Sequence, residues 1–210
     1  LLNLPNVIDF LRKPGWIMRR LASPRRNFGN LEQYAPGGPG KKPVPQVSAW
    51  IADQLDPNMC WADLDWIRSQ WPGKLIVKGI LDADDARRAV QAGVDAIVVS
   101  NHGGRQLDGA VAPLRVLPGI VRAVPGLPGM LDSGVRRGTD VLKALALGAR
   151  CVFVGRPFNY AASVAGPAGV AHAMALLREE VLRDMAMLGA TRLDQVTPAC
   201  VRHAQAWDAF

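Results

Sequence analysis

The fold is decided by four short apolar runs, LIVKGI (75–80), AIVVSN (96–101), GMLDSG (129–134) and CVFVGRP (151–157). Each run is rich in β-branched or other apolar residues and ends in glycine or polar residues, as buried strands do. Helical patterns separate the runs, at residues 82–92, 113–124 and 139–147. Since buried strands that alternate with helices pair in parallel, the sequence predicts an α/β fold with a parallel sheet.

The predicted strands begin at the regular spacing of successive strand-helix units. This spacing favours a (β/α)8 TIM barrel or a doubly wound sheet. A complete barrel usually needs about 250 residues. Because the chain has 210 residues and only four such units, we expect it to hold about half of a barrel.

The flanking sequence is predicted to be mainly helical. Helices are expected within residues 1–30, at 61–71, at about 166–189 and at 193–203, and a Pro/Gly-rich loop at 34–46. Within 61–71, the apolar side chains of Trp61, Leu64, Ile67 and Trp71 are expected to belong to the core. These patterns divide the chain into a basic helical segment with a loop, residues 1–60, and a barrel portion, residues 61–210.

The composition, 49% apolar and 20% charged, is that of a globular domain. The three cysteines lack the spacing of a disulfide framework or a metal site, so we expect no metal and a reducing cytoplasm. No uninterrupted apolar run reaches the roughly 18 residues that a bilayer span needs, and the first residues lack a signal-peptide pattern.

The net charge of +7 gathers near the beginning of the chain. Arg12, Lys13, Arg19, Arg20, Arg25 and Arg26 interleave there with Phe10, Trp16, Ile17 and Leu21. One interpretation is a solvated basic helix with a buried apolar stripe, and the other is a segment that binds an anionic membrane surface. Nucleic acid is not expected as a partner, because no recognition motif accompanies the charge.

Each of the four predicted runs ends in reactive or phosphate-binding residues. They are Lys78, then Ser100, Asn101 and His102, then Asp132, Ser133 and Gly134, and finally Gly155 and Arg156. In parallel α/β folds functional groups collect at the carboxyl ends of strands. The sequence therefore predicts one site that all four strand ends share.

The segment SNHGGRQLDG (100–109) predicts acid-base chemistry on a carboxylate substrate. His102 is a candidate general base, since the ordinary pKa of histidine lies near neutrality. The planar guanidinium of Arg105 matches a carboxylate. Gly103 and Gly104 allow the backbone to pass close to a flat ring.

The segments DSGVRRGTD (132–140) and GRP (155–157) predict a phosphate site. They offer backbone amides, Arg136 and a helix N-terminus near Thr139, as does the common anion pocket of barrels after strands seven and eight. If these are strands seven and eight, four earlier strands lie upstream of Leu1.

Together these blocks resemble one family. VKGI, SNHGGRQLDG, DSGVRRGTDVLKALALGA and VFVGRP are similar, in the same order, to the signature blocks of the FMN-dependent 2-hydroxy-acid dehydrogenases and oxidases. That family includes glycolate oxidase, L-lactate dehydrogenase and mandelate dehydrogenase. The resemblance runs from about Trp61 to the C-terminal region. It implies a (β/α)8 barrel of which this chain carries strands five to eight, with residues 1–60 between strands four and five.

The resemblance also implies roles for the site residues. Lys78 is expected near flavin N1, where it stabilises the negative charge of the reduced ring, and Ser100 is expected to contact the flavin. His102 is expected to take the substrate proton, and Arg105 to pair with the substrate carboxylate. The ribityl chain and phosphate of FMN are expected on Asp132, Ser133, Gly134, Val135, Arg136, Gly155 and Arg156.

The expected function is FMN-dependent oxidation of an L-2-hydroxy acid, with lactate preferred, to the 2-oxo acid. The electrons are expected to pass to a quinone, a cytochrome or oxygen. The resemblance favours a homo-oligomer such as a tetramer, in the cytoplasm or peripheral on the inner face of the membrane. A second arginine, an aspartate that orients the histidine, and substrate tyrosines belong to earlier strands of the family. We therefore expect this stretch alone to be inactive and poorly stable, with exposed sheet edges.

Two other interpretations stay open. Another phosphate-binding barrel, such as a nucleotide-dehydrogenase type of FMN enzyme or a sugar-phosphate isomerase, explains DSG and GRP equally well but not His102 with Arg105. A non-catalytic half-barrel that binds membranes through its basic segment explains the charge but not the strand ends.

Overall fold

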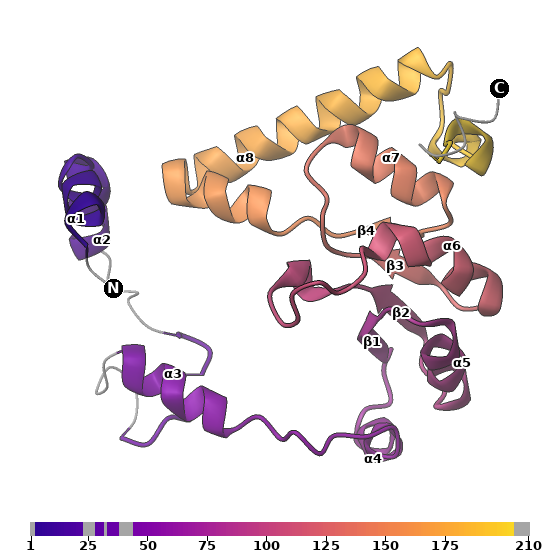
Figure 1. Ribbon diagram of the computed structural model, residues 1–210, viewed down its shortest axis with the longest axis horizontal. Coiled ribbons are helices and arrows are strands. Elements are labelled where there is room, and N and C mark those ends of the chain that lie inside the picture. Colours follow the sequence, from indigo (N-terminus) through magenta and orange to yellow (C-terminus); the bar gives the residue numbers. More distant parts are fainter. Residues whose placement is uncertain (1–2, 23–27, 32, 38–43, 204–210) are drawn as a thin grey trace. The chain divides into compact units, whose positions relative to one another are not determined.

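The computed structural model describes residues 3–22, 28–31, 33–37 and 44–203 (Figure 1). The chain divides into two compact units, residues 1–59 and 60–210, and each is described by itself. Arg25, Arg26 and part of the predicted loop at 34–46 lie outside the described residues. That residues 1–60 join barrel strands four and five stays a prediction.

The described part of the first unit contains helices α1 (Leu4–Leu11), α2 (Pro14–Ala22) and α3 (Val44–Asp53). Neither α1 nor α2 buries a residue, so the interpretation of a buried apolar stripe is wrong for this segment. Helix α3 begins inside the predicted loop, because a proline, here Pro45, is accepted in the first turn of a helix.

The second unit is a four-stranded parallel sheet with helices between the strands. Its elements in chain order are α4 (Asp63–Gln70), β1 (Ile76–Ile80), α5 (Ala83–Gln91), β2 (Ala96–Val99), a 3₁₀ turn η1 (His102–Gly104), α6 (Pro113–Ala123), β3 (Gly129–Leu131), α7 (Gly138–Ala146), β4 (Cys151–Val152), α8 (Arg156–Met187) and the 3₁₀ turns η2 (Leu193–Gln195) and η3 (Pro198–Cys200). The strands pair in the order β1-β2-β3-β4. The predicted parallel α/β sheet is thus confirmed, and Figure 1 shows α5 and α6 on the same side of it.

The core lies between the sheet and α6. All four residues of β2 are buried. Ile97 and Val99 of β2 pack in one cluster with Leu117 and Ile120 of α6 and with Leu131 of β3. Full burial of one such side chain stabilises the fold by about 1.5–3 kcal/mol. This cluster fixes the central strands and therefore the positions of the strand ends.

Asp95 ties three segments together at the amino end of the sheet. Its carboxylate accepts hydrogen bonds from Arg68 Nη2 at 2.9 Å, from Lys74 Nζ at 2.8 Å and from the backbone N–H of Leu75 at 2.8 Å. These bonds, first that from Lys74, hold the pKa of Asp95 well below its ordinary value. Helix α4 is thereby fixed to the starts of β1 and β2.

Helix α4 itself meets the prediction only in part. Trp61 and Leu64 pack against the core as expected. Trp71 does not, because it follows the end of the helix, where its side chain is exposed and its indole N–H donates to the carbonyl of Lys74 at 3.1 Å.

The C-terminal part differs from the prediction in three places. Strand β4 is only two residues long. Helix α8 begins ten residues before the predicted 166, and it bends at Ala165–Gly166, where Gly166 has φ of 57° ahead of Pro167. Two 3₁₀ turns replace the predicted helix at 193–203, since Pro198 lacks the N–H that a continuous helix needs.

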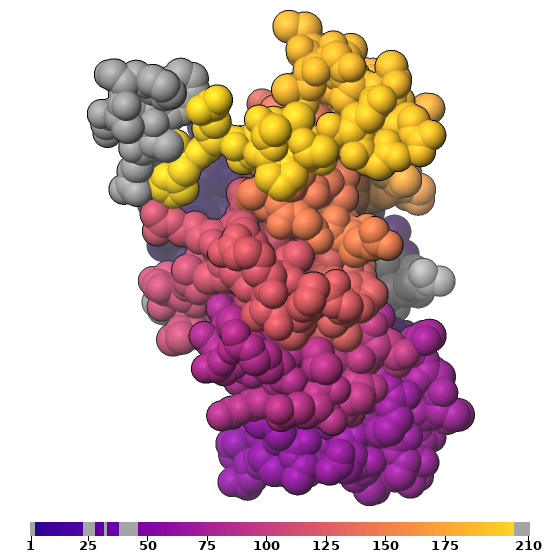
Figure 2. All heavy atoms as spheres, turned by 90° about the vertical axis from the view of Figure 1, so that its right-hand side faces the viewer, coloured from indigo at the N-terminus to yellow at the C-terminus, as the bar shows by residue number. Residues whose placement is uncertain are grey.

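Helix α8 also differs from the expectation that no stretch is long and apolar enough to span a bilayer. Among the described residues it alone meets that test of length and composition. None of its most apolar 18-residue window is buried. Outside that window α8 packs on α7, where Met185 joins Leu142 and Ala146 in a second apolar cluster. Figure 2 shows the face of the second unit on which the colours pass in chain order from α5 through α6 and α7 to α8.

Candidate active site

The carboxyl ends of the four strands surround one cavity of about 430 Å³. Every predicted site residue except Ser100 lines it: Lys78, His102, Arg105, Asp132, Ser133, Gly134, Val135, Arg136, Gly155 and Arg156. Sequence reasoning missed Gln106, Phe153 and Asn159, which also line it. Gln106 follows Arg105 directly, whereas Phe153 and Asn159 carry no motif that marks them as site residues.

Ser100 is completely buried behind the cavity wall. Its hydroxyl donates to Asp132 Oδ2 at 2.7 Å and accepts from Lys78 Nζ at 3.2 Å and from the backbone N–H of His102 at 3.0 Å. It therefore links the ends of β1, β2 and β3. The direct contact of Ser100 with a flavin stays a prediction.

Asp132 and Lys78 form an ion pair, with Lys78 Nζ 3.0 Å from Asp132 Oδ2. Partial burial raises the pKa of Asp132, but hydrogen bonds from Ser100 and Lys78 and the charge of Lys78 outweigh it and leave the pKa below its ordinary value. The side-chain donors, including the Ser133 hydroxyl at 3.4 Å, all meet at Oδ2. Asp132 also lines the cavity, so its carboxylate can accept a hydrogen bond from a ligand hydroxyl.

His102 lies in a left-handed backbone conformation, with φ of 55°. Its ring packs over Gly79, where a Cβ would stand only 3.0 Å from His102 Cε1, and Gly79 has φ of 103°. Sequence reasoning missed this role of Gly79. A glycine inside a strand pattern often marks such a close approach, and that signal was available in VKGI.

The loop that carries His102 is held from both sides at Gly103. The N–H of Gly103 donates to Ser133 Oγ at 2.9 Å, and its carbonyl accepts from Arg156 Nη2 at 2.7 Å. A Cβ on Gly103 would lie 2.7 Å from that guanidinium nitrogen. The loops after β2, β3 and β4 are therefore linked next to the histidine.

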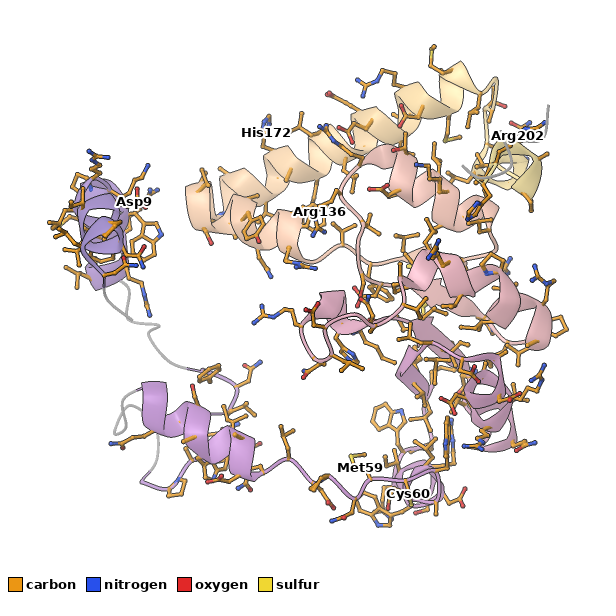
Figure 3. The ribbon with its side chains drawn as sticks, in the orientation of Figure 1. Asp9, Met59, Cys60, Arg136, His172 and Arg202 are labelled. Atoms are coloured by element: carbon orange, nitrogen blue, oxygen red, sulfur yellow. The ribbon has the colours of Figure 1, made fainter. Side chains whose placement is uncertain are left out.

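The loop between β3 and α7, residues 132–137, carries Arg136, which lines the cavity and is labelled in Figure 3. Its backbone amides at Arg136 and Arg137 donate to Asp140 Oδ2 at 2.9 and 3.0 Å, and the N–H of Gly138 donates to Glu180 Oε2 at 2.8 Å. The expectation that the amides at this helix N-terminus bind phosphate is corrected for these three, because carboxylates already accept from them. Among the cationic side chains that line the cavity, Arg136 and Arg156 belong to the two predicted phosphate-binding segments.

The charge of the cavity suits an anionic ligand. Four cationic side chains, Lys78, Arg105, Arg136 and Arg156, line it against one carboxylate, Asp132. Cations for a phosphate and for a substrate carboxylate, together with a carboxylate and a hydroxyl for ribityl hydroxyls, are the groups that FMN and an acid substrate need. The residues present therefore fit FMN.

The chain is similar to known proteins. A family model described as FMN-dependent dehydrogenase matches residues 2–203. An L-lactate dehydrogenase of Pseudomonas putida (strain GB-1) is 43% identical over 196 residues, which are 92% of this chain and 51% of that protein. An L-lactate oxidase of Nostoc sp. (strain PCC 7120) is 49% identical over 164 residues, which are 78% of this chain and 43% of that protein.

Two solved structures are also similar to this chain. The monotopic membrane protein (S)-mandelate dehydrogenase matches with a TM-score of 0.84 at 35% identity and covers 95% of this chain and 52% of its own. A mandelate oxidase matches with a TM-score of 0.65 at 46% identity and covers 69% of this chain and 43% of its own.

The chain spans about half the length of the curated relatives it matches. The parallel sheet is part of a (β/α)8 TIM barrel, as predicted, and the cofactor of the family is FMN. The match argues against the sugar-phosphate isomerase. Because the family model matches almost the whole chain, the chain belongs to the FMN-dependent dehydrogenase family.

Proposed function

We propose that the protein containing this chain oxidises an L-2-hydroxy acid to the corresponding 2-oxo acid. The observation that carries this proposal is that His102, Arg105 and the cationic residues of the phosphate site line one cavity. L-Lactate is the substrate we favour, since an L-lactate dehydrogenase and an L-lactate oxidase are among the relatives.

In this proposal each side chain has one task. FMN, when bound, supplies the acceptor for the two electrons that leave the substrate. Arg105 pairs its guanidinium with the substrate carboxylate and so fixes the orientation of the acid. An imidazole nitrogen of His102 accepts a proton that the substrate loses on oxidation. Lys78 holds a positive charge at the site, which stabilises negative charge that develops nearby.

The remaining lining residues would hold the cofactor. Arg136 and Arg156 would bind its phosphate, and the carboxylate of Asp132 would accept from a ribityl hydroxyl. Ser133, Gly134, Val135 and Gly155 complete the wall on that side. Arg156 then serves two loops, because it also donates to the carbonyl of Gly103 beside His102.

The direct test is the absorbance spectrum of the purified full-length protein during anaerobic addition of L-lactate, glycolate and L-mandelate in turn. Flavin bands that bleach with one acid would establish the reaction and name the substrate. A protein that carries no flavin, or flavin that none of these acids reduces, would contradict the proposal.

The isolated 210-residue chain is proposed to turn over no hydroxy acid, because a barrel needs eight strands and the described residues hold four. The full-length protein is proposed to pass electrons to a quinone, a cytochrome or oxygen, and to assemble as a homo-oligomer such as a tetramer. Turnover of lactate by the isolated chain would contradict the first of these proposals.

We also propose that the first unit attaches the protein to an anionic membrane surface. Helices α1 and α2 expose large apolar side chains, namely Leu4, Val7, Ile8, Phe10, Leu11, Trp16, Met18 and Leu21. Between 3 and 22 the chain has four basic residues and a single acidic one, Asp9 (Figure 3). A similar structure, which covers most of this chain, is described as a monotopic membrane protein. Apolar area together with positive charge is the combination that binds an interface.

Vesicle co-sedimentation of the full-length protein tests this attachment. Replacing Arg19 and Arg20 by alanine should weaken binding to phosphatidylserine vesicles by roughly 30-fold, at about 1 kcal/mol for each arginine. The matched control replaces Arg87 and Arg88 of α5. Equal binding of the two double variants to phosphatidylserine vesicles would contradict the attachment. So would wild-type protein that binds neutral vesicles as well as phosphatidylserine vesicles.

A further inference from the structure

We propose that Glu180, on helix α8, is a positioning residue for the phosphate-binding loop, residues 132–137. Glu180 does not line the cavity and lies far along the chain from the loop it contacts. The proposal rests on the proposed FMN site and adds to it a support that the sequence motifs do not contain.

Both carboxylate oxygens of Glu180 are engaged at the end of this loop. Oε2 accepts from the backbone N–H of Gly138 at 2.8 Å, and Oε1 accepts from Arg137 Nη1 at 2.7 Å. The side chain of Glu180 is only 19% exposed, whereas that of Arg137 is 73% exposed. Glu180 is therefore the half-buried partner in the contact with Arg137. Helix α8, which carries Glu180, sets the position of this contact.

The two helices touch at this point through their backbones. A Cβ on Gly138 would lie 2.6 Å from the backbone nitrogen of Val181 and 2.7 Å from the carbonyl carbon of Glu180. Only glycine permits so close an approach. One turn and two turns further along α7, Leu142 and Ala146 pack with Met185 of α8. Helix α8 is thus a fixed support for the start of α7.

The two neighbouring arginines of this loop make different contacts. Arg136 lines the cavity, while Arg137 turns to Glu180. Asp140, in the first turn of α7, accepts from the amides of both residues. Glu180 adds the anchor to a separate helix, and two carboxylates at a helix N-terminus also suit its partial positive charge. Without Glu180 the Gly138 N–H and the Arg137 guanidinium lose their acceptor, so the loop presents Arg136 less firmly.

The test compares FMN with riboflavin, which lacks the phosphate. Apoprotein of the full-length enzyme is titrated with each flavin in the wild type, in Glu180→Ala and in Glu179→Ala. Glu179 is the matched control, because it is the exposed neighbour on the same helix. We expect Glu180→Ala to raise the Kd for FMN about tenfold, the size of one charge-assisted hydrogen bond to the phosphate that a less firmly held Arg136 would lose, and to leave the Kd for riboflavin unchanged. Glu180→Gln, which can still accept from Gly138, should fall between.

The outcomes separate this proposal from the proposed function. Wild-type protein that binds no FMN would refute the flavin site itself. FMN affinity that is the same in Glu180→Ala and Glu179→Ala would overturn only the role of Glu180. An equal loss of FMN and riboflavin affinity would also overturn it, because a general loss of structure does not discriminate by the phosphate.

Discussion

The two ends of the sheet carry the same kind of ion pair for different purposes. At the amino end Asp95 pairs with Lys74 and Arg68, and its donors occupy both carboxylate oxygens. At the carboxyl end Asp132 pairs with Lys78, and its side-chain donors gather at Oδ2 beside a cavity. Asp95 fastens segments together through both of its oxygens, whereas Asp132, which lines the cavity, can also bind a ligand. The following variants of the full-length protein test this division.

The largest effect is expected from His102 at the carboxyl end. His102→Ala should lower the rate of flavin reduction by about 10²- to 10⁴-fold, the usual contribution of a general base, while the protein keeps its flavin. Stopped-flow absorbance under anaerobic conditions measures this rate. His172→Ala is the control, since His172 is exposed on α8 and points away from the sheet (Figure 3). Similar rates in the two variants would rule out His102 as the base.

Arg105 should matter less than His102 but more than any residue at the amino end. Arg105→Met removes the proposed partner of the substrate carboxylate and should lower kcat/KM by about 10- to 100-fold, mainly through a higher KM. Steady-state kinetics with L-lactate measures the change, and Arg115→Met on the exposed side of α6 serves as the control. An unchanged KM in Arg105→Met would place the carboxylate elsewhere.

Stability should depend more on the amino end than on the carboxyl end. Asp95→Asn weakens the contacts that fix α4 to β1 and β2, so its Tm should fall by a few degrees. Asp132→Asn should lower the Tm of the apoprotein less, because its side-chain donors meet at one oxygen, whereas the donors of Asp95 engage both. Calorimetry of both apoproteins measures the two decreases in Tm. A larger decrease in Asp132→Asn than in Asp95→Asn would contradict the proposed difference between the two ends of the sheet.

The smallest effect concerns pH. The pKa values of Asp95 and Asp132 both lie below the ordinary value in the folded protein. A lowered pKa stabilises the fold fully above the unfolded pKa of about 3.9, and the contribution is lost as the pH falls through the folded pKa. The Tm difference between wild type and Asp95→Asn should therefore stay constant from pH 8 to about 5 and shrink only below about pH 4. A difference that shrinks near pH 6 would contradict the assigned direction.

The sequence predicted the sheet and the cavity well because both depend on local signals. Apolar runs that end in Lys78, His102, Asp132 or Arg156 place these residues at strand ends, and parallel strands bring their ends together. The bend of α8 was harder to predict from the sequence. Gly166 and Pro167 suggested the start of a helix, whereas in the structure one helix changes direction there.

Contacts between distant segments left no such signal. Nothing near Glu180 in the sequence indicates that its carboxylate accepts from Gly138, 42 residues away. The same holds for Arg156, whose guanidinium donates to the carbonyl of Gly103. Both depend on how α8 packs, which follows from the whole fold rather than from a local pattern.

The most direct test of the central claim is an FMN titration of full-length apoprotein in the wild type, Asp132→Asn and Asp95→Asn. The account predicts one FMN per chain in the wild type, a Kd raised about tenfold in Asp132→Asn through the loss of a charged acceptor, and an unchanged Kd in Asp95→Asn. Wild-type protein that binds no FMN, or two variants that lose affinity equally, would contradict the claim that the carboxyl end of this sheet holds the cofactor.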